Sequence, residues 1–398
     1  MSQQSQDNSE KNKTSMLQTR VVLISLNVAA FSFFIMMPGL VGAMVDHLSF
    51  SDAQAGWVAT VHMFGFFAVT LGASLSIHRW NLKRSILLGL LLLLSADGTC
   101  AVMKSYSTWI GLRLAGGIGS GLIWCSIAAY VAKFKDPDPF FGMLWCAQFT
   151  LGAIGLYTLP HLLQGINLQG VFCCIATLSL LGLIALVWLP GSARSADQNL
   201  AGSQPLTRLM TLPIIMVFFA YILMAAGEAG LWTYWDRVGT SAGIPVEKVG
   251  LSLSLSQIGG MLGGLLAAWI GTRFGRTIPV SIGLSLIMAS LAAVIIDITM
   301  VTFTSAAFFF TSAISFVSCY YMGITAEADP SGRLVATANV MFSLGMFVGP
   351  GLASLVVGHG YSTLLWIMLG HFALSLVLVL PATRVQKTVP RHDAPLTT

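Results

Sequence analysis

Apolar residues along this chain are gathered into long unbroken stretches that polar segments separate. A helix that crosses a bilayer needs about 20 consecutive apolar residues, and roughly twelve such stretches can be distinguished. Membrane β-strands are shorter and alternate polar with apolar positions, so the pattern predicts an all-α membrane protein. The predicted spans are about 21–45, 54–77, 85–103, 107–132, 140–163, 168–189, 211–235, 248–271, 277–298, 303–326, 335–357 and 362–382.

Composition supports lipid as the solvent. Of the 398 residues, 56% are apolar and only 9% are charged, whereas soluble domains carry about 25% charged residues. A surface this poor in charge cannot face water throughout, so membrane lipid is an expected partner. Residues 1–19 are polar and lack the apolar core of a signal peptide, so we expect them to be disordered.

Basic residues set the predicted orientation. If both termini are cytoplasmic, 16 of the 20 Lys and Arg residues lie on the cytoplasmic side, which is a strong positive-inside bias. Only Lys104, Arg237 and Lys248 fall on the other side, and Arg113 lies within the membrane. The prediction is a multi-pass protein of a plasma membrane, specifically a bacterial inner membrane. The net charge of +5 then requires no nucleic-acid partner.

The chain divides into two similar halves. A Ser/Ala/Gly-rich segment, 191–208, follows six predicted spans and precedes six more. With an offset of 194, Gly56 aligns with Gly250, Gly65 with Gly259, and Arg79 with Arg273. A parallel repeat of six spans implies two bundles with a binding cavity between them, and rocking of the bundles gives alternating access. The predicted segments are a disordered N-terminus 1–19, a first bundle 20–190, a cytoplasmic linker 191–209, a second bundle 210–384 and a cytoplasmic tail 385–398.

Three motifs resemble the major facilitator superfamily, and the resemblance covers essentially the whole chain. "RLAGGIGSG" at 113–121 is similar to that family's fourth-helix pattern R-x-x-x-G-x-G-x-G. "HRWNLKR" at 78–84 and "GTRFGR" at 271–276 lie where the family has its basic loops. The resemblance implies twelve transmembrane helices in two six-helix bundles and a transport function.

The loops depart from the family pattern. His78 and Thr272 stand where the family has an acidic residue, and Leu82 replaces a basic one. The basic residues of these loops are candidates for a cytoplasmic gate, or they serve topology alone. They are Arg79, Lys83, Arg84, Arg273 and Arg276.

Arg113 is the ionisable residue that most needs a partner. Ionisable groups within a membrane are functional candidates by default, and Arg cannot shed its proton. Asp97 and Arg113 lie equally far from the predicted hairpin turn near Ser105, about 12 Å along each helix. The counting predicts an Asp97–Arg113 pair, which could couple transport to protons or act as a purely structural clamp.

Two further groups are candidates for proton coupling. Glu228 shares a predicted helical stripe with Tyr221, Trp232 and Trp235. An acid among aromatic residues and glycines suits a proton carrier, although it could instead bind a helix terminus. His62 lies at a comparable predicted depth and belongs to the residue type that titrates near neutral pH. Its alternative role is that of a hydrogen-bonded packing residue.

Other residues inside the spans are candidate packing or substrate contacts. Gly117 and Gly121 are four residues apart and would let another helix approach closely. Many aromatic residues and few charges favour an aromatic or amphipathic organic substrate. The candidate substrate contacts are Asn27, Trp124, Gln148, Tyr157, Tyr221, Trp232, Gln257, Tyr320 and Asn339.

These observations predict a secondary active transporter for a small organic solute, coupled to protons and working in export. The alternative is a proton symporter that takes up an organic anion, with Arg113 binding the carboxylate of that anion. No H-E-x-x-H, G-x-S-x-G or phosphate-binding loop occurs, so we expect neither enzymatic activity, nor a cofactor, nor a metal site. The expected functional unit is a monomer.

Overall fold

The computed structural model describes residues 2–134, 137–190, 206–329 and 331–386, and all regular structure in them is helical. The first half contains α1 (Ser2–Ile35), α2 (Met37–Leu48), α3 (Asp52–Ser76), α4 (Leu82–Cys100), α5 (Tyr106–Val131) and α6 (Pro137–Ala185). The second half contains α7 (Leu206–Leu209), α8 (Leu212–Ser241), α9 (Val246–Ile270), α10 (Thr277–Ile296), α11 (Met300–Ala328), α12 (Arg333–Val356) and α13 (Tyr361–Gln386). Short 3₁₀ turns cover Ile77–Arg79, Leu186–Trp188 and Val357–His359.

The helices confirm the predicted all-α membrane fold. Ten described helical segments are long and apolar enough to cross a membrane. Two further spans complete the twelve: α4, which carries three charged residues, and the second part of α6, which begins where Asn167 breaks the helix with φ 59° and ψ 176°. The first span is α1 followed by α2, with a break at Met36 just before Pro38.

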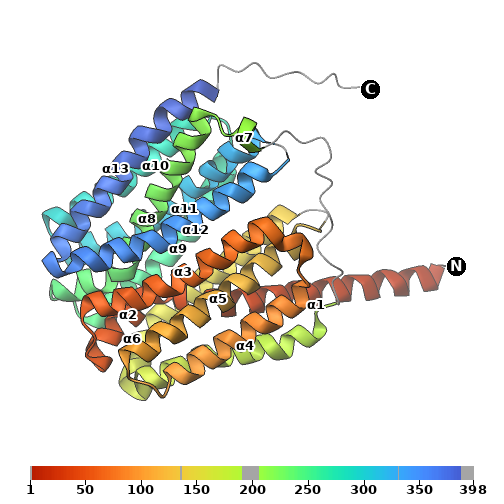
Figure 1. Cartoon of the computed structure of the whole chain (residues 1–398), viewed down its shortest axis with the longest axis horizontal. Helices are drawn as coiled ribbons and strands as arrows, with labels where there is room; N and C mark the ends of the chain where they lie inside the picture. Colours follow the sequence, from red (N-terminus) through yellow and green to blue (C-terminus); the bar gives the residue numbers. More distant parts are fainter. Residues whose placement is uncertain (1, 135–136, 191–205, 330, 387–398) are drawn as a thin grey trace.

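One terminus differs from the expectation. The helix of the first span begins at Ser2, although residues 1–19 were expected to be disordered. Lys, Gln and Glu are good helix formers, and adding a turn to an existing helix costs far less than starting one. The polar segment therefore continues the helix of the span that follows it, and Figure 1 shows it projecting beyond the bundle. Most of the predicted linker and tail lies outside the described residues.

The two halves form two blocks that lie side by side (Figure 1). The main contacts between them are α3 with α12, α6 with α9, and α2 with α8. We call the end of the bundle that carries the chain termini the terminal side. The opposite end, with the α2–α3 connection 49–51, is the distal side.

Glycines bring equivalent helices together in both halves. A Cβ atom at Gly117 of α5 would overlap the carbonyl of His62 in α3, and one at Gly263 of α9 would overlap the carbonyl of Ser312 in α11. Gly65 and Gly259, which the repeat aligns, likewise lie against the carbonyls of Leu114 and Phe308. The predicted packing role of the glycines after Arg113 is confirmed.

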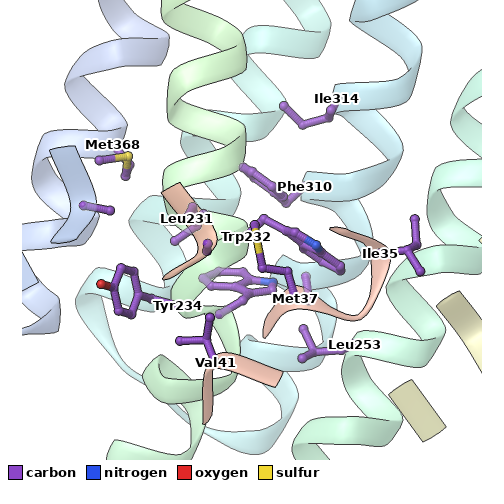
Figure 2. Close-up of a cluster of buried hydrophobic side chains, with 14 of the residues drawn as sticks. Ile35, Met37, Val41, Leu231, Trp232, Tyr234, Leu253, Phe310, Ile314 and Met368 are labelled. Atoms are coloured by element: carbon purple, nitrogen blue, oxygen red, sulfur yellow. The ribbon is translucent and has the colours of Figure 1, made fainter. Parts of the chain in front are cut away.

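The largest apolar core crosses the boundary between the halves. Figure 2 shows Met37 and Val41, from the first half, next to Leu231, Trp232 and Leu253 of the second. All five side chains are buried. The halves are therefore joined by an extensive apolar contact as well as by the polar contacts described below.

Candidate functional site: buried charges and the boundary between the halves

Arg113 is completely buried and forms the predicted pair with Asp97. Its Nη2 donates to Asp97 Oδ1 at 2.7 Å, and the two side chains are 0% and 1% exposed. The guanidinium also lies over the rings of Phe33 and Phe172, with 4.9 and 5.3 Å from Cζ to the ring centres. The pair belongs to the α4–α5 hairpin, as the equal counts from the turn predict.

His62 completes this charged centre. Its ring lies 4.5 Å from that of Phe33 and against the backbone of Arg113. Three buried nitrogens of the centre have no partner among the described residues: Nδ1 of His62, and Nε and Nη1 of Arg113. Nearly all buried polar atoms in proteins are hydrogen-bonded. The centre therefore has polar atoms that are available to water or to a small polar ligand in the described structure.

Glu228 has a different environment, on α8 at the boundary between the halves. Its neighbours Ala225 and Ala229 pack in one cluster with Met63 of α3 and Met346 of α12. The side chain is partly exposed, while its Oε2 is buried and has no hydrogen-bond partner in the described structure. No salt bridge to Glu228 occurs within the part of the chain that the structure describes. In the described structure the carboxylate of Glu228 therefore has no ion-pair partner, whereas that of Asp97 is paired with Arg113.

The predicted aromatic stripe beside Glu228 does not form one surface. Tyr221 stacks on Tyr321, with ring centres 4.8 Å apart. Trp235 packs against Phe303 and Phe310 inside the second half. Trp232 reaches across to the first half, where its Nε1 donates to the carbonyl of Phe34 at 3.1 Å.

Three predicted substrate contacts are buried polar side chains with defined surroundings. Asn27 Nδ2 donates to the carbonyl of Leu144 at 3.1 Å, and Gln148 Nε2 donates to Asn27 Oδ1 at 3.2 Å. These bonds tie α1 to α6 and leave both residues occupied. Gln257 is different, because its Oε1 is buried without a partner in the described residues and lies against Gly152 of the other half.

The remaining candidates are spread through the bundle. Trp124 packs edge-on against Phe31 and Phe141. Tyr157 is 51% exposed on the outer face of α6, next to the exposed His161. The Tyr320 hydroxyl donates to the carbonyl of Gly271, and Asn339 donates to the carbonyl of Val335 one turn earlier. In the described structure Tyr320 and Asn339 bond to these carbonyls and not to Arg113, Asp97 or Glu228.

The basic loops on the terminal side make contacts within their own halves. Lys83 donates to the carbonyl of Leu189 at 2.6 Å, and Arg79 donates to His78. The backbone of Arg84 bonds to the side chain of Asn81. In the second loop, Arg276 forms an ion pair with Glu327 of α11 at 2.7 Å. Arg273 lies over the ring of Trp269, 5.5 Å from its centre.

A polar network on the distal side was missed by the sequence analysis, which counted Arg237 only as an exception to the charge bias. Arg237 of α8 bonds to Asp52 and Asp46 of the first half, each at 3.1 Å. The hydroxyl of Tyr361 donates to Asp52 Oδ1 at 2.8 Å, and that of Tyr234 donates to the Asp52 carbonyl at 2.9 Å. These bonds fasten α8 and α13 to the start of α3. We call this network the distal latch.

Beside the distal latch lies a cavity of about 180 Å³ between α2, α6, α8 and α9. Its polar lining includes Asp46, His47, Gln164 and Asp236, from both halves. Asp236 is 6% exposed, and its carboxylate lies against Gly42. A further cross-boundary bond joins Gln164 to Glu247 at 2.8 Å.

Comparison with known proteins fits this architecture. The family model described as Major Facilitator Superfamily matches residues 22–333 and 217–397, and so spans nearly the whole chain. The chain belongs to the Major Facilitator Superfamily. Its resemblance to that family, stated above from three motifs, is therefore confirmed, and the protein is a multi-pass secondary transporter.

Two relatives are transporters of the same family, and two solved structures have the same fold. The chain is 20% identical over 377 residues to the uncharacterized MFS-type transporter YcaD of Escherichia fergusonii, covering 92% of this chain and 94% of that protein. It is 22% identical over 382 residues to the uncharacterized MFS-type transporter YE1530 of Yersinia enterocolitica, covering 93% and 97%. The crystal structure of a mutant of the nucleoside transporter NupG has a TM-score of 0.76 at 15% identity, covering 92% and 99%. The crystal structure of the nucleoside transporter NupG has a TM-score of 0.71 at 17% identity, covering 94% of this chain and 100% of that chain. These likenesses confirm the fold.

Proposed function

We propose that this transporter couples the export of a small aromatic or amphipathic solute to the movement of protons, with Glu228 as the proton carrier. The observation that carries the proposal is the free Oε2 of Glu228, buried at the boundary between the halves in the described structure. A carboxylate at a moving boundary can meet water on one side and then on the other as the halves rock. The protein acts as a monomer in a bacterial inner membrane with its terminal side in the cytoplasm.

Asp97 is the weaker candidate for the proton carrier. Its carboxylate is held by Arg113 at 2.7 Å with both side chains buried. Breaking such a pair by neutralising one partner typically costs about 3–5 kcal/mol. Glu228 has no bonded cation among the described residues, so proton loading there breaks no ion pair of this structure. In this proposal Arg113 and Asp97 hold α4 and α5 together and position His62.

Aromatic groups near the boundary support an aromatic solute. Phe347 of α12 lies 5.1 Å from Phe64 and 6.0 Å from Phe67 of α3, measured between ring centres. Such faces stack readily on a flat heterocycle. NupG is a nucleoside transporter, and a nucleoside is one solute of this class. A nucleoside is therefore the first probe to test.

The runner-up is proton symport of an organic anion, and one observation favours it. Arg113 keeps Nε and Nη1 free of partners in the described structure, and a substrate carboxylate could accept hydrogen bonds from both. Against it, Arg113 is 0% exposed and its Nη2 is already bonded to Asp97. Uptake by this route requires a conformation that exposes Arg113.

Transport in vesicles tests the proposal. Purified protein is reconstituted, a pH gradient is imposed, and uridine, an aromatic organic cation and benzoate are offered in turn. We expect accumulation of uridine or the aromatic cation only when the gradient drives protons in the opposite direction. Glu228→Gln should abolish this accumulation and retain gradient-free exchange of the solute. Asp297→Asn, an exposed acid on the distal side, is the matched control and should behave as the parent.

The outcomes separate the two candidates. Gradient-driven accumulation that persists in Glu228→Gln would show that another group carries the proton. Benzoate accumulation together with protons, lost in Arg113→Lys, would establish symport of an anion instead.

A further inference from the structure

The second half carries an apolar groove on its outer surface. The groove has a volume of about 530 Å³ and lies between α9 and α10, with α11 as its floor. Leu266 and Ile270 line it from α9, Ile282 and Leu286 from α10, and Phe316 from α11. Leu266, Ile282 and Leu286 are exposed, so in a membrane the groove faces the hydrocarbon of the bilayer.

Glycines explain why the groove exists. Gly263 brings α9 close to the backbone of α11 at Ser312, and Gly283 brings α10 against Val317 of the same helix. Both helices pack on α11 and hardly touch each other along their described lengths. The floor between them is therefore uncovered, and α9 and α10 meet only at their connection, 271–276. From Ile270 to Leu262 the groove runs about 12 Å towards the middle of the membrane.

The connection places a positive charge at the mouth of the groove. Ile270, Phe274 and Ile278 line the groove where it meets this connection. Arg276 is neutralised by Glu327. Arg273 lies on the ring of Trp269, is exposed, and forms no ion pair with any carboxylate in the described residues. Arg273 is thus a permanent cation that directly precedes Phe274, a residue of the groove lining, in the chain.

We propose that this groove, together with Arg273, binds an anionic phospholipid from the leaflet on the terminal side. One acyl chain lies in the groove, and the phosphate lies at the guanidinium of Arg273. The apolar lining selects a hydrocarbon chain, and the cation selects a negative headgroup. The bound lipid fills the space between α9 and α10 and braces them against α11.

The repeat offers a matched control for the charge. Arg79 is the counterpart of Arg273, at the same place in the loop of the first half, and it bonds to the neighbouring His78. Ile296 is a matched control for the groove, because it is exposed on α10 and does not line the groove. Each substitution in the site can therefore be paired with a similar substitution outside it.

Native mass spectrometry of the purified full-length protein tests the proposal. The protein is extracted in mild detergent and titrated with phosphatidylglycerol or phosphatidylcholine of identical chains. We expect the parent to retain one phosphatidylglycerol more strongly than phosphatidylcholine. Arg273→Gln should lower that preference about fivefold, the usual effect of one cation near a lipid surface. Ile282→Trp, which fills the groove, should reduce retention of both lipids, whereas Arg79→Gln and Ile296→Trp should match the parent.

Two results would overturn the proposal. Equal retention of both lipids by the parent and all four variants would mean that the groove holds bulk lipid only. An equal loss of preference in Arg79→Gln and Arg273→Gln would assign the selectivity to basic loops in general. Thermal unfolding of each variant in detergent without added lipid identifies any variant that fails because it is misfolded.

Discussion

The two halves of the molecule share their packing and differ in their charges. In both halves a glycine brings a pair of equivalent helices together, Gly117 in the first and Gly263 in the second. The first half buries an arginine and an aspartate as a bonded pair, while the second presents at the boundary a glutamate that is unpaired among the described residues. The two halves therefore share the close approach of helices at glycines. Their ionisable groups differ, because one half buries a bonded pair and the other presents an unpaired acid at the boundary.

The largest expected effect comes from unpairing the charges of the first half. Asp97→Asn leaves the buried guanidinium of Arg113 without its counter-charge, which should cost about 3–5 kcal/mol of stability. Glu228→Gln in the second half removes a carboxylate that forms no ion pair in the described structure, and it should change stability little. Thermal unfolding of the purified variants in one detergent, followed by tryptophan fluorescence, measures both.

A double variant controls for the charge itself. Asp97→Asn combined with Arg113→Gln should recover part of the loss, because neither member then carries a buried charge. Equal destabilisation by Asp97→Asn and Glu228→Gln would contradict the contrast between a paired and a free carboxylate.

The next effect tests the shared packing. Gly117→Ala and Gly263→Ala each place a methyl group against a backbone carbonyl, and overpacking of this kind typically costs about 1–3 kcal/mol. We expect similar losses in the two halves. Gly111→Ala and Gly264→Ala are the controls, because a Cβ at either position meets nothing within 4 Å in the described structure. A loss confined to one half would show that only one of the two contacts is tight.

Features with a local cause could be predicted from the sequence. The spans follow from the length of the apolar stretches, and the Asp97–Arg113 pair follows from equal counts about one hairpin turn. The role of Gly117 follows from its spacing to Gly121. Each of these depends on residues close together in the chain or on one helical period.

Features that depend on how the halves meet could not be predicted. Arg237 is 185 residues from Asp52, and Tyr361 is 309 residues from it, so no periodicity links them. The bond between Asn27 and Gln148 could not be predicted either, since a buried amide looks the same in sequence whether it faces a substrate or another helix.

Breaking the distal latch should change the conformation of the protein more than its stability. Arg237→Gln removes both ion pairs across the boundary, and partly exposed pairs are worth about 0–1 kcal/mol each. The expected result is a larger population with the distal side open, and little change in unfolding temperature. Spin labels at Ser51 and Thr363, in a cysteine-free background, report the distance between the halves there.

The matched control for the latch lies on the terminal side. Arg276→Gln breaks an ion pair of similar exposure that stays within the second half, so the distal distances should remain those of the parent. If Arg237→Gln leaves the distances unchanged as well, the two ion pairs do not hold the distal side closed, and the apolar contacts in Figure 2 with the remaining hydrogen bonds to Asp52 are sufficient.

A last effect, on stability alone, concerns Asp329, which precedes α12 and follows the same Asp-Pro pattern as Asp136 when the repeat offset is 193 instead of 194. Its carboxylate accepts hydrogen bonds from the backbone of Ser331, Arg333 and Leu334. Burial raises the pKa of Asp329, but these bonds and one from the Ser331 hydroxyl outweigh it and hold the pKa below its ordinary value. A lowered pKa in the folded state means that the carboxylate stabilises the fold above its unfolded pKa of about 4, and that this contribution is lost as the pH falls further.

Asp329→Ala should therefore cost about 1 kcal/mol at pH 7, as the loss of a helix cap does, and progressively less below about pH 4. Unfolding temperatures of parent and variant between pH 3 and pH 7 measure this convergence, and a difference that stays constant across the range would assign the effect to packing. The same series on Asp136→Ala determines whether the repeat extends to this cap.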